Sequence, residues 1–154
     1  MLMPMLLGCT TVFISMGIQV LVVVLMIRFV FNIMNRKDRD THSITFDTMV
    51  IGVVLLILFV GHMLQIAIWA ELFIVLNEFD DFLSAFYHSA VNFASLGYGD
   101  IVMSERWRLL GAIEASNGVL MFGLSAGTLL SVMSALFAHH RQTIPTIKGK
   151  TKTT

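Results

Sequence analysis

The sequence predicts an all-α membrane protein with three transmembrane helices and one short re-entrant helix. Of its 154 residues, 56% are hydrophobic and only 13% are charged, an apolar share above that of soluble globular domains. Three stretches supply the roughly 20 apolar residues that a helix needs to cross a bilayer. A shorter stretch between the second and third ends in a loop that contains glycines. A water-soluble fold is therefore not expected.

The first two predicted spans are almost free of charge. The first runs from about Val12 to Phe31, and its one charged residue, Arg28, lies near the end, where a long side chain can reach the membrane interface. The second lies within Thr48 to Ala70, where only His62 and Gln65 are strongly polar. Both stretches are long enough to cross the hydrocarbon core as helices.

The third predicted span, from Leu109 to Ala138, is longer and contains one acid, Glu114. At 1.5 Å per residue this helix would reach about 45 Å, so we expect it to tilt or to project into water at one end. A carboxyl group two turns inside a span is costly, and such a residue is either functional or paired.

The segment between the second and third spans contains a helix that is too short to cross. Phe82 to Ala94 has neither Gly nor Pro and follows Asp80 and Asp81, which suit the positive N-terminal end of a helix. Such a helix would be about 20 Å long. A short helix followed by a glycine-bearing loop between two spans is typical of a re-entrant segment, which needs protein or water around it. This arrangement predicts a pore.

The positions of Lys and Arg predict the orientation. Eight of the ten lie on one side of the predicted spans: Arg28, Arg36, Lys37, Arg39, Arg141, Lys148, Lys150 and Lys152. This side is expected to face the cytoplasm, which puts the N-terminus outside and the C-terminus inside a plasma membrane, or an inner membrane in a bacterium. Arg106 and Arg108 lie on the outer side with six acids, Glu71, Glu78, Asp80, Asp81, Asp100 and Glu105.

The loop after the short helix has the sequence Ser95-Leu96-Gly97-Tyr98-Gly99-Asp100. Its glycines alternate with larger residues, which suits a strand whose backbone alternates in handedness so that successive carbonyl groups face one axis. The short helix would also point its negative C-terminal end toward the membrane centre, which favours a cation there. This hexapeptide resembles the selectivity filter of potassium channels.

The resemblance covers about Thr48 to Ala138 and is similar to the two-helix pore module of small bacterial potassium channels. It implies a homotetramer in the lipid bilayer that conducts K+ passively, because each chain supplies one carbonyl per layer and four must surround the ion. The implied K+ ligands are the carbonyls of Ser95, Leu96, Gly97 and Tyr98, with Gly99 completing the filter. No further cofactor, no nucleic acid and no identifiable protein partner is implied.

The chain then divides into residues 1–45, an additional transmembrane helix with a cytoplasmic linker, residues 46–138, the pore domain, and residues 139–154, a basic cytoplasmic tail. Five residues are expected to support the filter: Asp100, Tyr87, His88, Asn92 and Glu114. Tyr87 and His88 match positions where the family carries bracing aromatics, and for His88 this role is preferred to that of a ligand or proton relay. Glu114 either faces the conduction path or braces the short helix, with Asn117 as a further partner, and the brace is preferred.

Gly118 matches the position of the family's gating hinge, although a glycine can also serve close helix packing. Small residues recur at four-residue steps along the third span, which is typical of a packing face: Gly111, Ala115, Gly123, Gly127, Ser131 and Ala135. For Gly123 and Gly127 packing is preferred to a hinge, whereas for Gly118 both interpretations stay open.

Several departures from the family pattern bear on the ion. Ser95 replaces Thr, Asn92 and Ala94 replace positions that are commonly Thr, and Leu96 replaces Val or Ile. A weakly selective monovalent cation channel is therefore an alternative. A second alternative is a non-conducting scaffold or sensor subunit that uses its first helix to hold a partner.

Other functions have no visible basis in the sequence. An enzyme is not expected, because no nucleophile with an oriented base, no metal cluster and no nucleotide loop is visible. Voltage, calcium or nucleotide gating also lacks a recognisable motif. His42, His139 and His140 lie at predicted cytoplasmic membrane edges, where they either sense pH or are simply solvated. The single cysteine, Cys9, excludes an intrachain disulfide.

Overall fold

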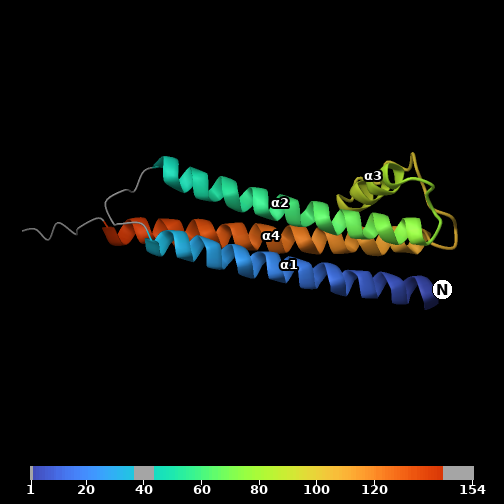
Figure 1. Cartoon of the computed structure of the whole chain (residues 1–154), viewed down its shortest axis with the longest axis horizontal. Coiled ribbons are helices and arrows are strands. Elements are labelled where there is room, and N and C mark those ends of the chain that lie inside the picture. The colour runs from blue at the N-terminus through green and yellow to red at the C-terminus, as the bar shows by residue number, and fades with distance from the viewer. Residues whose placement is uncertain (1, 37–43, 144–154) are drawn as a thin grey trace, which may run out of the picture.

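A computed structural model describes residues 2–36 and 44–143, and these residues form four helices. They are α1 (Leu2–Arg36), α2 (Ile44–Val75), α3 (Phe82–Phe93) and α4 (Arg108–Thr143). Helices α1, α2 and α4 run side by side as a long bundle, and the short α3 lies against one end of it, at the same end as the N-terminus (Figure 1). The predicted all-α fold with a short helix between two long ones is confirmed.

Three of these helices are long and apolar enough to cross a membrane, over Leu2–Ile33, Thr45–Val75 and Arg108–Ala138. Large apolar side chains on their outer surfaces are exposed, such as Phe13, Leu56 and Leu130, as expected where lipid rather than water surrounds a helix. The predictions for Lys37, Arg39, His42 and residues 144–154 fall outside the described residues. The side chains of Arg36 and of residues 139–143 also fall outside the described part.

Helix α1 begins ten residues earlier than the predicted start at Val12. Pro4 lies in its first turn, where the missing N–H has no intrahelical partner to lose. Gly8 does not end the helix but brings it close to α4, since a Cβ at this position would lie 2.7 Å from the side chain of Ile113. Both residues that resemble helix breakers are therefore compatible with a helix that continues to Arg36.

Helix α2 also extends past the predicted end of its span, from Ala70 to Val75. Asn77 then adopts a left-handed conformation with a φ of 57°, and the Glu78 N–H donates to the Phe73 carbonyl at 3.0 Å. This is the pattern of a Schellman C-cap, for which Asn is the usual alternative to Gly.

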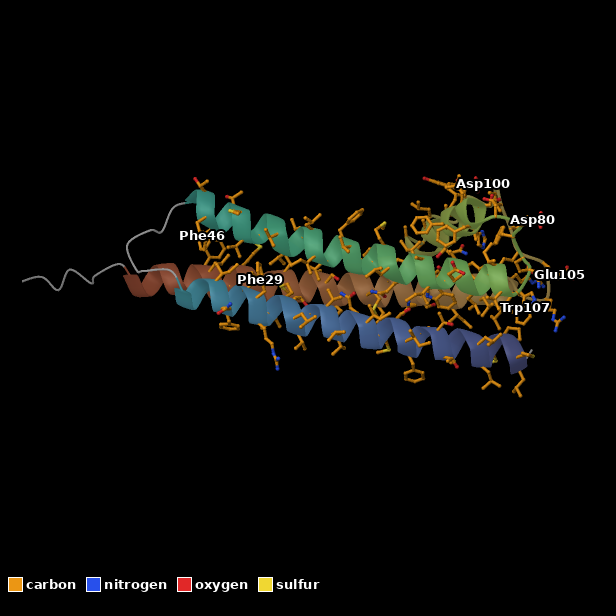
Figure 2. All side chains as sticks on the ribbon, viewed as in Figure 1. Phe29, Phe46, Asp80, Asp100, Glu105 and Trp107 are labelled. Atoms are coloured by element: carbon orange, nitrogen blue, oxygen red, sulfur yellow. The ribbon has the colours of Figure 1, made fainter. Side chains whose placement is uncertain are left out.

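The interior of the bundle has two apolar clusters. One lies at the α3 end and includes Trp69, Phe73 and Phe93 together with Trp107 and Leu110. The other lies toward the opposite end of the bundle and consists of aliphatic residues and methionine: Met26, Val30, Val50, Val54, Leu58, Val132 and Leu136. Figure 2 shows Asp80, Asp100, Glu105 and Trp107 gathered at the α3 end, and Phe29 and Phe46 toward the other.

Candidate functional site

Helix α3 positions the candidate filter, which we define as Ser95 to Asp100. The helix begins after Asp81, whose carboxylate accepts a hydrogen bond from the Ser84 N–H at 2.9 Å. This bond lowers the pKa of Asp81, as expected for an N-cap acid. The predicted helix from Phe82 is thus confirmed, with Ala94 as its C-cap residue.

The end of α3 determines the conformation of the first residue of the candidate filter. Leu96 N–H donates to the Val91 carbonyl at 2.9 Å, and Ser95 N–H donates to the Asn92 carbonyl at 2.7 Å. These two bonds form a Schellman motif with Ser95 in its left-handed position, where its φ is 57°. Ser95 therefore belongs both to the C-terminal cap of α3 and to the candidate filter.

The backbone of the candidate filter alternates in handedness. Ser95, Gly97 and Gly99 have φ values of 57°, 60° and 72°, whereas Leu96 and Tyr98 between them do not have a positive φ. Added Cβ atoms at Gly97 and Gly99 would meet nothing within 4 Å, so their conformation rather than lack of space accounts for the glycines. Leu96 and Tyr98 are 53% and 65% exposed, and one subunit therefore leaves this strand uncovered.

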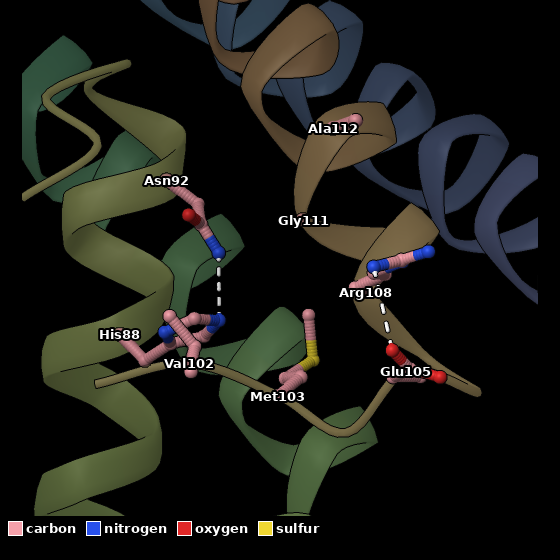
Figure 3. Close-up of a pocket in the computed structure, with 8 residues that line it drawn as sticks. All are labelled: His88, Asn92, Val102, Met103, Glu105, Arg108, Gly111 and Ala112. Carbon is pink, nitrogen blue, oxygen red and sulfur yellow. Dashed lines mark hydrogen bonds and ion pairs between the residues drawn. The ribbon is translucent and has the colours of Figure 1, made fainter. Parts of the chain in front are cut away.

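Two side chains of α3 contact the far end of the candidate filter. The Tyr87 hydroxyl donates to the Asp100 carboxylate at 2.7 Å. His88 Nδ1 lies 3.0 Å from the Ile101 carbonyl, and Asn92 Nδ2 lies 2.9 Å from His88 Nε2 (Figure 3). Because a carbonyl can only accept, Nδ1 carries the proton and Nε2 accepts from the Asn92 amide. The first two bonds connect α3 to both residues that follow Gly99, and the third, within α3, holds the His88 ring in place.

The two partners of His88 require a neutral imidazole with one defined tautomer. Burial lowers its pKa, while the Ile101 carbonyl and the charges of Asp100 and Glu78 act in the opposite direction. The hydrogen bond from Tyr87 lowers the pKa of Asp100, which therefore stays ionised at neutral pH. A neutral imidazole and a negative charge thus lie side by side at the Asp100 end of the candidate filter.

Hydrogen bonds also join the loop before α3 to the loop after the candidate filter. Both carboxylate oxygens of Glu78 are engaged by Ser104, one by its backbone N–H at 2.6 Å and the other by its hydroxyl at 2.7 Å. Ser104 also accepts from the N–H groups of Trp107 and Arg108 at the start of α4. Sequence reasoning missed this pair, because nothing in the sequence connects residues 26 positions apart.

Glu114 is fully buried against α3, where the Ser89 hydroxyl contacts its Oε1. The same hydroxyl lies 2.9 Å from the Ile66 carbonyl. Ser89 has one proton for two acceptors, so a carboxyl group that carries its own proton satisfies all three groups. These contacts are those of a brace between α2, α3 and α4. Asn117 is buried as expected, but within the described residues its amide makes no hydrogen bond, to Glu114 or to any other group.

Gly118 lies directly against the end of α3. A Cβ at this position would lie 1.9 Å from the Phe93 carbonyl oxygen, closer than any side chain permits. Close packing therefore accounts for this glycine, and the hinge role stays a prediction.

Added Cβ atoms at Gly123 and Gly127 would meet nothing within 4 Å in the subunit, so the packing expected for these two is not made within one chain. Helix α4 packs instead through another face: Leu110, Glu114, Asn117, Met121, Ser125, Thr128, Val132 and Leu136.

A cavity of about 480 Å³ opens between α3, the loop after the candidate filter and the start of α4. His88 and Asn92 line it from one side, and Gly111 and Arg108 from the other (Figure 3). Among residues 2–36 and 44–143, no group of three His, Cys, Asp or Glu side chains could hold a metal ion.

The matched segment of the chain contains the candidate filter and the helices around it. Residues 62–135 match a family model described as an ion channel, and this segment contains part of α2, all of α3, the candidate filter and most of α4. Neither the curated proteins nor the solved structures gave a match to the chain. Helix α1 lies outside the matched segment. This part of the chain is similar to ion channels, which supports a subunit of a membrane ion channel rather than an enzyme.

Proposed function

We propose that the chain is a subunit of a homotetrameric channel that conducts K+ passively through a filter formed by Ser95 to Gly99. The observation that carries the proposal is the alternating handedness of these residues, with positive φ at Ser95, Gly97 and Gly99. This conformation suits a ladder of carbonyl groups that replaces the hydration shell of an ion. The carbonyls of Ser95, Leu96, Gly97 and Tyr98 are the proposed ligands.

The uncovered strand supports an assembly of several copies. One chain offers one carbonyl per layer, which is too few to surround a cation, and four chains around a common axis supply four. Exposed Leu96 and Tyr98 would be covered in such an assembly. The free faces of Gly123 and Gly127 are likewise available to a neighbouring copy.

The arrangement of charges supports an outer mouth at the α3 end. The N-terminus lies at the same end as the candidate filter (Figure 1), where Asp100, Glu78 and Glu105 also lie. An acidic surface at the mouth raises the local concentration of cations. We therefore place this end outside the plasma membrane and the C-terminus in the cytoplasm.

Ion flux into vesicles that contain the purified protein tests the proposal. Gly99→Ala places a Cβ on a residue with a φ of 72°, so we expect it to abolish K+ flux or its selectivity. Gly52→Ala is the matched control, because Gly52 lies in α2 and its added Cβ would meet nothing within 4 Å. Equal K+ flux and selectivity in both variants would show that the loop is not the filter.

Two further measurements decide between the proposal and its alternatives. Native mass spectrometry in mild detergent should give a tetramer, and a stable monomer or dimer would count against a pore. The ratio of K+ to Na+ flux should be high, whereas comparable fluxes would indicate the weakly selective channel. No flux of either ion in an intact tetramer would indicate the non-conducting subunit.

A further inference from the structure

Four polar residues from three helices form a buried network near the middle of the bundle. Gln19 Nε2 of α1 donates to Ser125 Oγ of α4 at 2.9 Å, and Gln65 Nε2 of α2 donates to Gln19 Oε1 at 2.7 Å. Ser125 Oγ lies 3.1 Å from His62 Nε2, also of α2. We call these four residues the polar clamp. All are buried, and Gln19 and Gln65 are 0% exposed.

Gln19 is the central member of the polar clamp. Gln65 Nε2 also lies 3.4 Å from the Gly61 carbonyl oxygen of its own helix. Ser125 Oγ accepts from Gln19 Nε2 and makes a further hydrogen bond with His62 Nε2, in which the donor depends on the tautomer of His62. Gln19 is both acceptor and donor, so its removal interrupts the network at its centre.

The polar clamp ends at the base of the candidate filter. The ring of His62 packs against Phe93 and Phe122, with centroid distances of 5.8 Å and 4.9 Å, and Phe93 packs against Phe122 at 5.6 Å. Phe93 is the last residue of α3 and is 0% exposed. The Phe93 carbonyl group lies directly against Gly118 of α4. Only Ala94 separates it from Ser95.

We propose that Gln19 is a positioning residue for the ion-conducting site, which makes α1 part of the conduction module rather than a separate anchor. Burial of a glutamine side chain in the hydrocarbon region costs free energy unless its amide is hydrogen-bonded, and Gln19 finds its partners on α2 and α4. Through Ser125 and His62, Gln19 sets the position of Phe93 and thus of the first carbonyl groups of the filter. The inference rests on the proposed function where it is tested by ion flux. A second test, of the structure around Phe93, does not depend on whether the protein conducts ions.

The test compares two α1 variants of the full chain reconstituted in vesicles. Gln19→Leu removes both hydrogen bonds at similar volume, and Ser15→Ala is the control. Ser15 lies one turn away and is equally buried, but its hydroxyl has no partner in the described residues. We expect Gln19→Leu to lower the ratio of K+ to Na+ flux by about fivefold, in the range usual for coupled sites. Ser15→Ala should leave the ratio unchanged.

A second pair of variants covers the case in which Gln19→Leu does not assemble. Ser125→Thr keeps the hydroxyl and Ser125→Ala removes it, so only Ser125→Ala should lower the flux ratio of intact tetramers. A purely structural role would change the amount of tetramer without this difference. An unchanged ratio in both Gln19→Leu and Ser125→Ala would overturn the inference and leave the proposed function intact.

The structural readout is the 19F NMR signal of a fluorinated phenylalanine placed at position 93. Its shift should change in Gln19→Leu and Ser125→Ala but not in Ser15→Ala or Ser125→Thr. If the unmodified protein conducts no cation, the proposed function fails, and this signal alone decides whether the polar clamp positions Phe93. The same signal in all four variants would overturn the positioning role.

Discussion

The α3 end of the bundle and the apolar cluster toward its other end are built from different contacts. At the α3 end, side-chain hydrogen bonds join separate elements, as between Tyr87 and Asp100, Glu78 and Ser104, and Ser89 and Glu114. At the other end, the buried cluster around Val54 and Leu136 consists of apolar side chains. Lipid tails are as apolar as these side chains, so apolar packing alone gives helices little preference for one another in a membrane. Hydrogen bonds, in contrast, specify both partner and distance.

This contrast indicates which part of the fold can tolerate movement. The proposed filter would work only if its carbonyl groups keep their positions, and directional hydrogen bonds at the α3 end suit this requirement. The apolar cluster toward the opposite end can repack at small cost, because one apolar contact replaces another. We therefore expect substitutions to have large effects at the α3 end and small effects at the other.

The largest effect is expected for Gly118→Val. Its Cβ would overlap the Phe93 carbonyl oxygen at 1.9 Å, and the backbone of α3 would have to move. We expect a loss of about 3 kcal/mol or more in the free energy of unfolding, measured by circular dichroism in detergent. Gly17→Ala is the control, since its added Cβ would meet nothing within 4 Å and Ala favours a helix. Equal stability of the two variants would contradict the close contact.

Glu114 should respond according to whether its substitute keeps the hydrogen bond. Glu114→Ala removes the partner of Ser89 and leaves a cavity, which should cost roughly 2 to 4 kcal/mol of stability. Glu114→Gln retains a donor and an acceptor, and should cost about 1 kcal/mol or less. The single-channel current of intact Glu114→Gln tetramers should equal that of the unmodified protein. A lower current at an unchanged melting temperature would place the carboxyl group in the conduction path instead.

The neutral state of His88 predicts a dependence on pH. Since burial lowers its pKa in the folded protein, the unfolded chain takes up a proton more readily. Stability contributed by His88 is therefore complete above about pH 6.5, the ordinary pKa of histidine, and is lost as the pH falls below it. Melting temperatures across this range should fall less in His88→Gln than in the unmodified protein. The same slope in both would assign the effect to another group.

The smallest effects are expected for swaps that keep side-chain volume. Leu58→Ile in the apolar cluster and Leu110→Ile near α3 make the same change at the two ends, and each should cost under about 1.5 kcal/mol. Both leucines are buried, at 4% and 0% exposure. Only Leu110→Ile should also change the ratio of K+ to Na+ flux. A larger change in the ratio of K+ to Na+ flux in Leu58→Ile than in Leu110→Ile would contradict the expected difference between the two ends.

Much of the architecture follows from the sequence because it depends on local signals. The apolar stretches predicted three long helices, and Asp81 marked the start of α3. The start of α1 was wrong by ten residues, because Pro4 and Gly8 are tolerated for reasons of position and of contact with Ile113.

The hydrogen bonds of the candidate site could not be predicted from the sequence. Asp100, Tyr87, His88 and Asn92 entered through the family resemblance, which assigns positions but not hydrogen bonds. Gln19 was not singled out, because one polar residue in an apolar span does not identify its partners. Its bonds to Gln65 and Ser125 bridge 46 and 106 positions of the chain. Such pairings depend on how helices are rotated against one another, which hydropathy does not specify.

Because Ser95 belongs both to α3 and to the candidate filter, the length of α3 determines where the carbonyl groups of the candidate filter lie. Ser95 completes the C-cap of α3 and is also the first residue of the strand. Each residue of an α-helix advances the chain by about 1.5 Å and turns it by about 100°. Insertion of a single residue into α3 would therefore turn and shift every following carbonyl group, even with the hexapeptide unchanged. The register of the twelve-residue helix is thus as much a determinant of the proposed ion pathway as the glycines themselves.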